Sequence, residues 1–168
     1  MERIKVWLAS SEVEPFIKTG GLADVAGSLP KALKALDVDI RVVLPKYGQI
    51  DTKYVSKMEF VGSCKVDLTW RKQYCGIFKL EYDGVTYYFI DNEYYFFRDG
   101  LYGLYDDGER FSFFCKAILE VLPVIGFKPD IIHLNDWQTG MVSLLLDAHY
   151  RNREGGFYRN IHTLFTIH

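Results

Sequence analysis

The sequence is poor in the features that mark several large classes of protein. Only three of its 168 residues are cysteine, and Cys64, Cys75 and Cys115 form no CxxC pair. This spacing argues against a disulfide framework or a structural zinc site and favours small, buried, reduced thiols in a cytosolic setting. No apolar run approaches the roughly 18 residues of a membrane span, and Met1 leads into a strand-like segment, not a signal peptide. We therefore expect a soluble protein of the cytoplasm, or of a plastid if a transit peptide is missing.

An excess of charge of one sign is also lacking. The formal net charge is −2, from 20 Lys and Arg against 22 Asp and Glu. Without a general cationic field the chain is a poor candidate for nucleic-acid binding, so any anion site has to be local. No histidines or carboxylates stand at a metal-ligand spacing such as HxxxH, and the phosphate fingerprints GxGxxG and GxxxxGK[ST] are absent. The sequence predicts no metal site.

What the chain does contain is an alternation of strand-like and helix-like segments. At 168 residues it is long enough for one well-packed domain and too short for two. The apolar spacing predicts strands over residues 5–9, 39–44, 130–134 and 162–167. It predicts helices over residues 21–36, 107–122 and 137–150. The first of these helices contains Pro30, which we expect to kink it. On the last helix, the side chains expected to point toward the core are Met141, Leu144, Leu145 and Ala148.

Residues 59–90 follow a different pattern, in which strand-like runs succeed one another and a strong hairpin turn lies at Asp83 and Gly84. We interpret them as a β-meander inserted in, or extending, the sheet. The continuous Val and Leu run of residues 39–44 suits a strand buried on both faces of a parallel sheet. The order βαβ, meander, αβαβ therefore predicts an α/β fold with a doubly wound, mainly parallel, Rossmann-like sheet.

Residues 18–21 lie between the first strand and the first helix and read KTGG. Free backbone N–H groups and the positive end of a helix dipole favour an anion there. Gly20 and Gly21 would let a ligand approach the backbone, and Lys18 adds a full positive charge. A diphosphate could be held at this loop. An ordinary strand–helix turn with a solvated Lys18 explains the same residues.

Further polar segments are expected at the same sheet edge, because ligands of open α/β sheets gather outside the carboxyl ends of the strands. Residues 135–137 follow one predicted strand, His168 ends the last one, and the aromatic loop 95–103 precedes a helix on the same rim. Each has a plain structural alternative. Asp136 is a good helix N-cap, worth about 1 kcal/mol, and spacing alone favours that role.

The other candidate side chains also have structural explanations. His133 lies within a predicted strand and suits a hydrogen-bonded core histidine. Asp24 at a helix start would stabilise the helix dipole without any ligand. The aromatic side chains of the 94–105 loop suit hydrophobic packing, although aromatic faces also bind sugar rings.

Four segments together resemble bacterial glycogen synthases and plant starch synthases. In chain order they read KTGGLADVAGSLPKAL (18–33), YYFFRDGLYG (94–103), HLNDWQTG (133–140) and TIH (166–168). The resemblance implies the N-terminal half of a two-domain GT-B glycosyltransferase. Residues 1–168 would form its acceptor-side catalytic domain, cut at the last strand, and the nucleotide-binding domain would lie beyond His168. The KTGGL form implies ADP-glucose as the donor.

The same resemblance implies the chemistry and its residues. Glucose would pass from ADP-glucose to the nonreducing 4-hydroxyl of an α-1,4-glucan with retention of configuration, without a cofactor, in partnership with the protein's own C-terminal domain. The isolated chain would be almost inactive. Catalytic roles fall to Lys18, Asp136 and His168; substrate contacts fall to these three and to Gly20, Gly21, Asp24, Tyr102 and Trp137. Two alternatives remain open: another two-domain glycosyltransferase or phosphorylase using a UDP-sugar or phosphate, or a noncatalytic glucan- or nucleotide-binding module.

Overall fold

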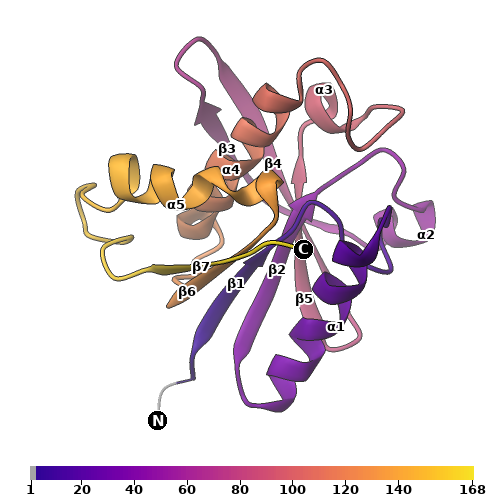
Figure 1. Ribbon diagram of the computed structural model, residues 1–168, viewed down its shortest axis with the longest axis horizontal. Helices are drawn as coiled ribbons and strands as arrows, with labels where there is room; N and C mark the ends of the chain where they lie inside the picture. The colour runs from indigo at the N-terminus through magenta and orange to yellow at the C-terminus, as the bar shows by residue number, and fades with distance from the viewer. Residues whose placement is uncertain (1–2) are drawn as a thin grey trace.

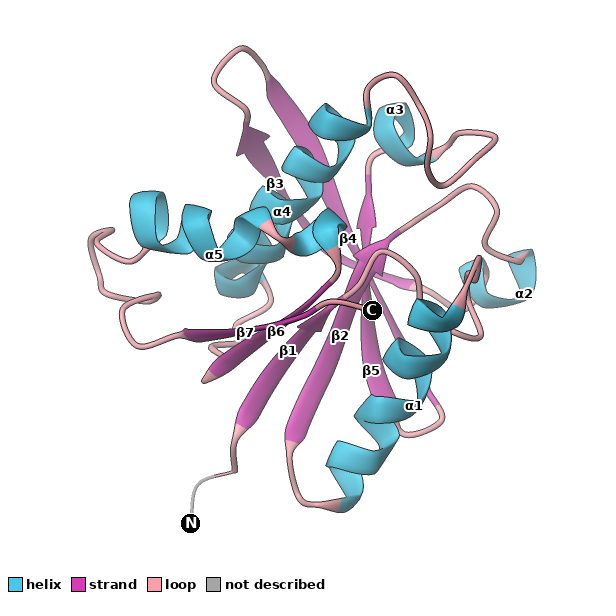
Figure 2. Ribbon diagram, viewed as in Figure 1, coloured by secondary structure: helices cyan, strands magenta, loops and turns pink. Residues whose placement is uncertain are grey.

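The computed structural model describes residues 3–168, which form a seven-stranded mixed sheet flanked by helices (Figure 1, Figure 2). The strand order across the sheet is β3-β4-β5-β2-β1-β6-β7. The strands are β1 (Lys5–Ala9), β2 (Asp39–Pro45), β3 (Glu59–Asp67), β4 (Lys72–Tyr82), β5 (Val85–Asp91), β6 (Ile131–Asn135) and β7 (His162–Thr166).

Five neighbouring strands, from β5 through β2, β1 and β6 to β7, run parallel. The chain leaves β1 toward β2 and β5 on one side and later returns to β6 and β7 on the other. The order thus reverses between β1 and β6, the topological switch point at which ligands of such sheets bind. The predicted doubly wound, mainly parallel sheet is confirmed.

The predicted meander is also confirmed, and it extends the sheet at one edge. Strands β3 and β4 pair antiparallel with each other, and β4 pairs antiparallel with β5. The turn between β4 and β5 falls at Asp83 and Gly84, with φ of 49° and 75°. Both angles are positive, as the short Asp-Gly turn requires.

Helices lie on both sides of the sheet (Figure 1). On one side α1 (Gly21–Ala35) continues through Pro30, and on the other α4 (Asp107–Val124) lies beside α5 (Met141–Leu145). Short helices α2 (Thr52–Val55) and α3 (Glu93–Phe96) occupy connections. Trp7, fully buried on β1, donates from Nε1 to the carbonyl of Ile118 at 3.0 Å and joins the sheet to α4. No helix within residues 3–168 is both long enough and apolar enough to cross a bilayer.

The predicted helix 137–150 is a succession of three helical forms. A 3₁₀ turn, η1 (Trp137–Thr139), precedes α5, and a π-helical turn, η2 (Leu146–Tyr150), follows it. A helix with changing numbers of residues per turn does not keep the 3.6-residue phase on which the predicted inward face depended. That face was therefore wrong at Met141, Leu144 and Ala148, which are exposed. The buried side chains of the α5 and η2 segments are Val142, Leu145, Leu146 and Tyr150.

Candidate functional site

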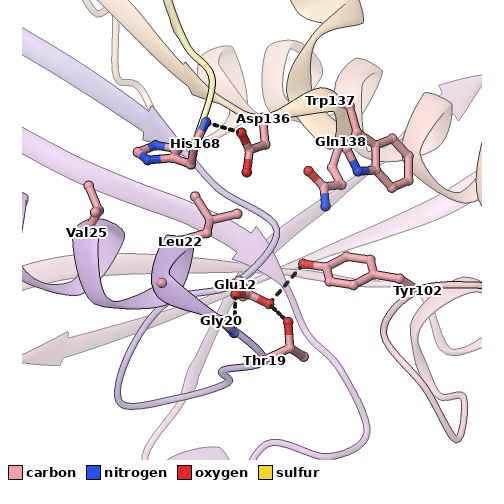
Figure 3. Close-up of a pocket in the computed structure, with 11 residues that line it drawn as sticks. Glu12, Thr19, Gly20, Leu22, Val25, Tyr102, Asp136, Trp137, Gln138 and His168 are labelled. Carbon is pink, nitrogen blue, oxygen red and sulfur yellow. Dashed lines mark hydrogen bonds between the residues drawn. The ribbon is translucent and has the colours of Figure 1, made fainter.

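A cavity of about 660 Å³ opens at the switch point, beyond the carboxyl ends of β1 and β6 (Figure 3). Its wall includes six of the residues that the sequence singled out as a site: Gly20, Gly21, Tyr102, Asp136, Trp137 and His168. The remaining lining residues are Glu12, Thr19, Leu22, Val25 and Gln138. Segments separated by more than a hundred residues in the sequence therefore meet around one space.

Lys18 and Asp24 lie next to this cavity but do not line it. Nζ of Lys18 is 2.6 Å from Oδ1 of Asp24, and the two side chains remain 45% and 55% exposed. The hydrogen bond with Asp24 raises the pKa of Lys18, against a smaller desolvation effect. Asp24 instead lines a separate cavity of about 480 Å³ together with Glu14 and Lys31. Because an exposed ion pair contributes little to folding stability, Lys18 can exchange Asp24 for another anion.

Glu12 is the central polar residue of the site. It is only 2% exposed, and its carboxylate accepts from Oγ1 of Thr19 at 2.5 Å, from the N–H of Gly20 at 3.1 Å and from the hydroxyl of Tyr102 at 3.1 Å. The Gly20 N–H was predicted to face a bound anion. The structure corrects this expectation, because the carboxylate of Glu12 already occupies that donor at the positive end of α1.

Sequence reasoning missed Glu12, although a signal for it existed. Ser10, Ser11 and Glu12 directly follow β1, as Asn135 and Asp136 follow β6, so the same sheet-edge argument applied to them. Oγ of Ser11 lies 2.7 Å from the hydroxyl of Tyr102. Burial, with a contribution from Glu12, raises the pKa of Tyr102, so this hydroxyl stays protonated and available as a donor.

Asp136 does not cap the helix that follows it. Its backbone lies at φ 60° and ψ 178°, a region almost confined to glycine, and its side chain makes no capping bond to η1. Oδ1 instead accepts from the backbone N–H of His168 at 2.6 Å, while Nε2 of His168 lies 2.9 Å from Oδ1 of Asn135. The N-cap interpretation was wrong because this backbone turns the carboxylate toward the chain beyond β7. A conformation costing about 1–3 kcal/mol is held here by the surrounding bonds, as is common at functional sites.

His133 is the core histidine that its position in a strand indicated. It is 8% exposed, and its Nε2 lies 2.9 Å from Oγ1 of Thr166 on the neighbouring strand. Burial lowers the pKa of His133, and the proximity of His168 lowers it further. His133 is therefore disposed to remain neutral.

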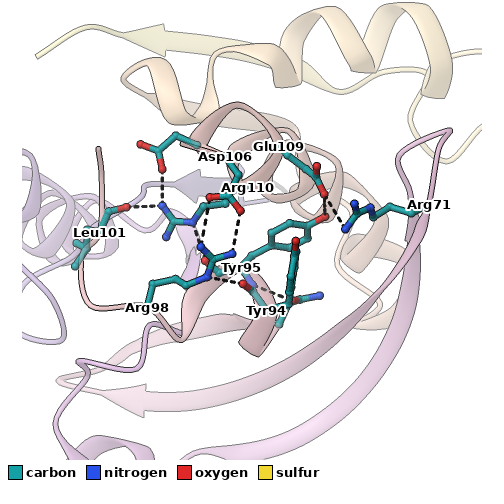
Figure 4. Close-up of polar contacts among 10 residues, drawn as sticks. Arg71, Tyr94, Tyr95, Arg98, Leu101, Asp106, Glu109 and Arg110 are labelled. Atoms are coloured by element: carbon teal, nitrogen blue, oxygen red, sulfur yellow. Dashed lines mark hydrogen bonds and ion pairs between the residues drawn. The ribbon is translucent and has the colours of Figure 1, made fainter. Parts of the chain in front are cut away.

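A buried arginine positions the loop that carries Tyr102 (Figure 4). Arg110 on α4 is fully buried and donates to the carbonyls of Tyr95 at 2.7 Å and Leu101 at 2.9 Å, and to Oδ1 of Asp107 at 2.7 Å. Beside it Arg98 pairs with Asp106 at 2.9 Å. These bonds fasten the loop to α4, so that Tyr102 is presented to the cavity by a fixed backbone.

Packing explains only part of the aromatic run in this loop. Tyr95 and Phe96 are fully buried, as expected of packing residues. Tyr94, Phe97 and Tyr105 were expected to pack as well, but they are 50%, 68% and 93% exposed. The alternation from Tyr94 to Phe97 follows from the short helix α3, which turns successive side chains to different sides, whereas Tyr105 lies in the turn before α4. None of these five residues lines the cavity.

The cavity combines acidic acceptors, hydroxyl and amide groups and an aromatic face. Glu12 and Asp136 supply carboxylates, Gln138 a carboxamide, and Trp137 an indole that is 57% exposed. Sugars are bound by such sets, since carboxylates and amides hydrogen-bond hydroxyls while aromatic faces cover C–H surfaces. Within residues 3–168, no group of three His, Cys, Asp or Glu residues is arranged to hold a metal ion.

Comparisons with known proteins agree with this chemistry. The family model described as starch synthase catalytic domain matches residues 5–168. The chain is 57% identical to a glycogen synthase of Anoxybacillus flavithermus and 58% identical to one of Geobacillus stearothermophilus, in each case over 98% of this chain and 34% of the relative. The fold also resembles a solved structure, the catalytic domain of starch synthase IV from Arabidopsis thaliana bound to ADP and acarbose. The TM-score is 0.88 and the sequence identity is 31%, and the match covers 100% of this chain and 34% of that one. The chain thus spans about a third of the length of the relatives that it matches.

Proposed function

The chain belongs to the family of starch synthase catalytic domains, and from that premise we propose that the whole protein transfers glucose from ADP-glucose to the nonreducing 4-hydroxyl of an α-1,4-glucan. The anomeric configuration is retained. The relatives extend well beyond the third of their length matched here, and we assign the nucleotide contacts to a second, C-terminal domain facing the cavity. The starch synthase IV relative is bound to ADP and acarbose, which supports a nucleotide-sugar donor and a glucan acceptor for this protein.

The observation that carries the proposal is the convergence of the four motif segments on one cavity. Gly20 and Gly21, Tyr102, Asp136 and Trp137, and His168 come from the four matching segments of sequence, and all of them line it. Packing or capping explained most of these residues singly. Neither explanation requires them to share a cavity at the topological switch point.

The residues of this chain have distinct roles in the proposed reaction. As the bond from C1 to the diphosphate oxygen breaks, its electron pair leaves with ADP, and Lys18, released from Asp24, stabilises the developing negative charge. The acceptor 4-hydroxyl oxygen forms the new bond to C1, and its proton passes to the departing diphosphate. Asp136 and His168, tied together at 2.6 Å, hold the reacting glucose in position, and Tyr102 orients the sugar. No cofactor takes part.

Donor competition in the full-length protein tests this assignment. We expect transfer to maltoheptaose from ADP-glucose, with little transfer from UDP-glucose. Lys18→Ala should lower kcat by about 10²-fold with a smaller change in KM for the donor, because the lost charge acts mainly on the transition state. Equal turnover of UDP-glucose would overturn the donor assignment, and unchanged kinetics in Lys18→Ala would remove Lys18 from the mechanism. Binding of glucan without any transfer or phosphorolysis would favour the noncatalytic alternative. The cytoplasmic location expected from the reduced cysteines stays a prediction.

A further inference from the structure

Gln138 is a buried polar side chain whose carbonyl oxygen is left unpaired in the part of the chain that the structure describes. The residue is 4% exposed and lies in η1, between Trp137 and Thr139. Its Oε1 atom is buried, and among residues 3–168 it has no hydrogen-bond partner, although the side chain belongs to the cavity lining. An unpaired buried carbonyl oxygen carries a desolvation penalty, so natural proteins seldom keep one without a use for it.

The backbone that carries this carboxamide is held by hydrogen bonds to buried groups. The carbonyl of Gln138 accepts a hydrogen bond from Sγ of the buried Cys115 at 3.2 Å. The neighbouring hydroxyl of Thr139 is bonded to the carbonyl of Asn135 at 3.0 Å. The side chain points into the space between Asp136 and Tyr102 (Figure 3). Gln138 is therefore presented to the cavity on a rigid support, as binding groups need to be.

A second cavity adjoins the site cavity at Gln138. It has a volume of about 250 Å³, shares Trp137 and Gln138 with the site cavity and is lined further by Phe111 and Met141. A donor sugar is a single ring and needs only the first space. A glucan acceptor is a chain, and its successive rings require room that leads away from the reacting end, with apolar surfaces for their C–H faces.

We propose that the carboxamide of Gln138 binds a hydroxyl pair of a glucosyl unit of the acceptor chain, at the junction of the two cavities. Oε1 accepts from one sugar hydroxyl while Nε2 donates to its neighbour, the two-atom match that a carboxamide offers to a vicinal diol. This inference rests on the proposed function, since it takes an α-1,4-glucan as the ligand. It adds a residue to the acceptor site that neither charge nor sequence spacing had marked.

Binding and stability measured together test the assignment in the full-length protein. Gln138→Met keeps the size of the side chain and removes both hydrogen-bonding atoms. We expect the Kd for maltoheptaose, measured by calorimetry, to rise about three- to tenfold, the effect of one or two neutral hydrogen bonds. The KM for ADP-glucose should stay within twofold. The thermal midpoint should be unchanged or higher, because the substitution removes an unpaired buried polar group.

Gln73→Met is the matched control. Gln73 lies on β4, lines neither cavity and accepts a hydrogen bond from Asn92, so its substitution should leave maltoheptaose binding unchanged. The proposal is overturned if Gln138→Met binds maltoheptaose within twofold of the parent protein, or if the parent protein does not bind it. It is also overturned if both Gln138→Met and Gln138→Leu are destabilised or unfolded, since Gln138 would then serve the fold. Normal glucan binding without any glucose transfer would instead refute the proposed enzyme function and leave the Gln138 comparison decisive.

Discussion

Removing the carboxylate of Glu12 should loosen three segments of the site at once. Glu12 joins the end of β1 to the Lys18–Gly21 loop through Thr19 and Gly20, and to the aromatic loop through Tyr102. In Glu12→Ala the three donors lose their common acceptor. In Glu12→Gln one side-chain oxygen remains to accept, and the added NH₂ group still pairs with a hydroxyl.

The magnitude follows from the number of donors and from their access to water. A donor left unsatisfied in a buried position costs about 1–3 kcal/mol. The cavity admits water to this region, and Tyr102 keeps its contact of 2.7 Å with Ser11, so the lower end of that range applies to each donor. Glu12→Ala should therefore lose about 2–4 kcal/mol of folding free energy, and Glu12→Gln about 1 kcal/mol. Because the Tyr102 hydroxyl loses one of its two partners and keeps only Ser11, kcat/KM for glucose transfer should fall about 100-fold in Glu12→Ala.

Urea unfolding followed by tryptophan fluorescence measures the first effect, and transfer to maltoheptaose in the full-length protein measures the second. Glu14→Ala is the control, because Glu14 is two residues away, exposed and outside the cavity, and it should change stability by less than about 0.5 kcal/mol. If Glu12→Ala costs no more than Glu14→Ala, the carboxylate does not hold these segments together. Lost stability with undiminished transfer would show that the Tyr102 contact has no part in catalysis.

Three other perturbations have definite expected outcomes. Arg110→Met should cost about 3–5 kcal/mol in urea unfolding, because it leaves Asp107 and two loop carbonyls without their buried partner. Gly27→Ala should be strongly destabilising, since the added Cβ would lie 2.5 Å from the carbonyl oxygen of Glu14. At Gly108 an added Cβ would have open space within 4 Å, so Gly108→Ala should be neutral or mildly stabilising in the same assay. Because the pKa of His133 is lowered in the folded protein, the imidazole takes up a proton more readily in the unfolded chain as pH falls. The free energy of unfolding should therefore decrease below about pH 6.5, and it should decrease less in His133→Asn. Equal pH dependence of the two proteins would refute this.

Local sequence patterns determined much of the fold and the place of the site. The strand at residues 5–9 has the same bounds in the structure, and the Asp83-Gly84 turn lies where the hairpin signal put it. The sheet-edge argument located the cavity because parallel strands end at a common edge whatever their loops contain. These features depend on periodicity and connectivity, which the sequence carries directly.

Other features depend on tertiary contacts that no local pattern encodes. The helical phase after Trp137 shifted because a 3₁₀ turn and a π turn flank α5. Asp136 does not cap the following helix because its positive φ directs the carboxylate to the backbone N–H of His168. The unused carboxamide of Gln138 could be recognised only once its surroundings were known, since the absence of a partner is a property of the folded chain.

The most direct test of the central claim, that the switch-point cavity is where glucose is transferred, compares two aspartate variants of the full-length protein. Asp136 lines the cavity, whereas Asp147 lies on η2 with a side chain 66% exposed. Radiolabelled glucose incorporated from ADP-glucose into maltoheptaose should fall at least about 100-fold in Asp136→Asn, with the fold intact, because a fixed polar group that positions the reacting sugar is lost. It should remain near the parent rate in Asp147→Asn. Parent-like incorporation by a folded Asp136→Asn protein would contradict the account.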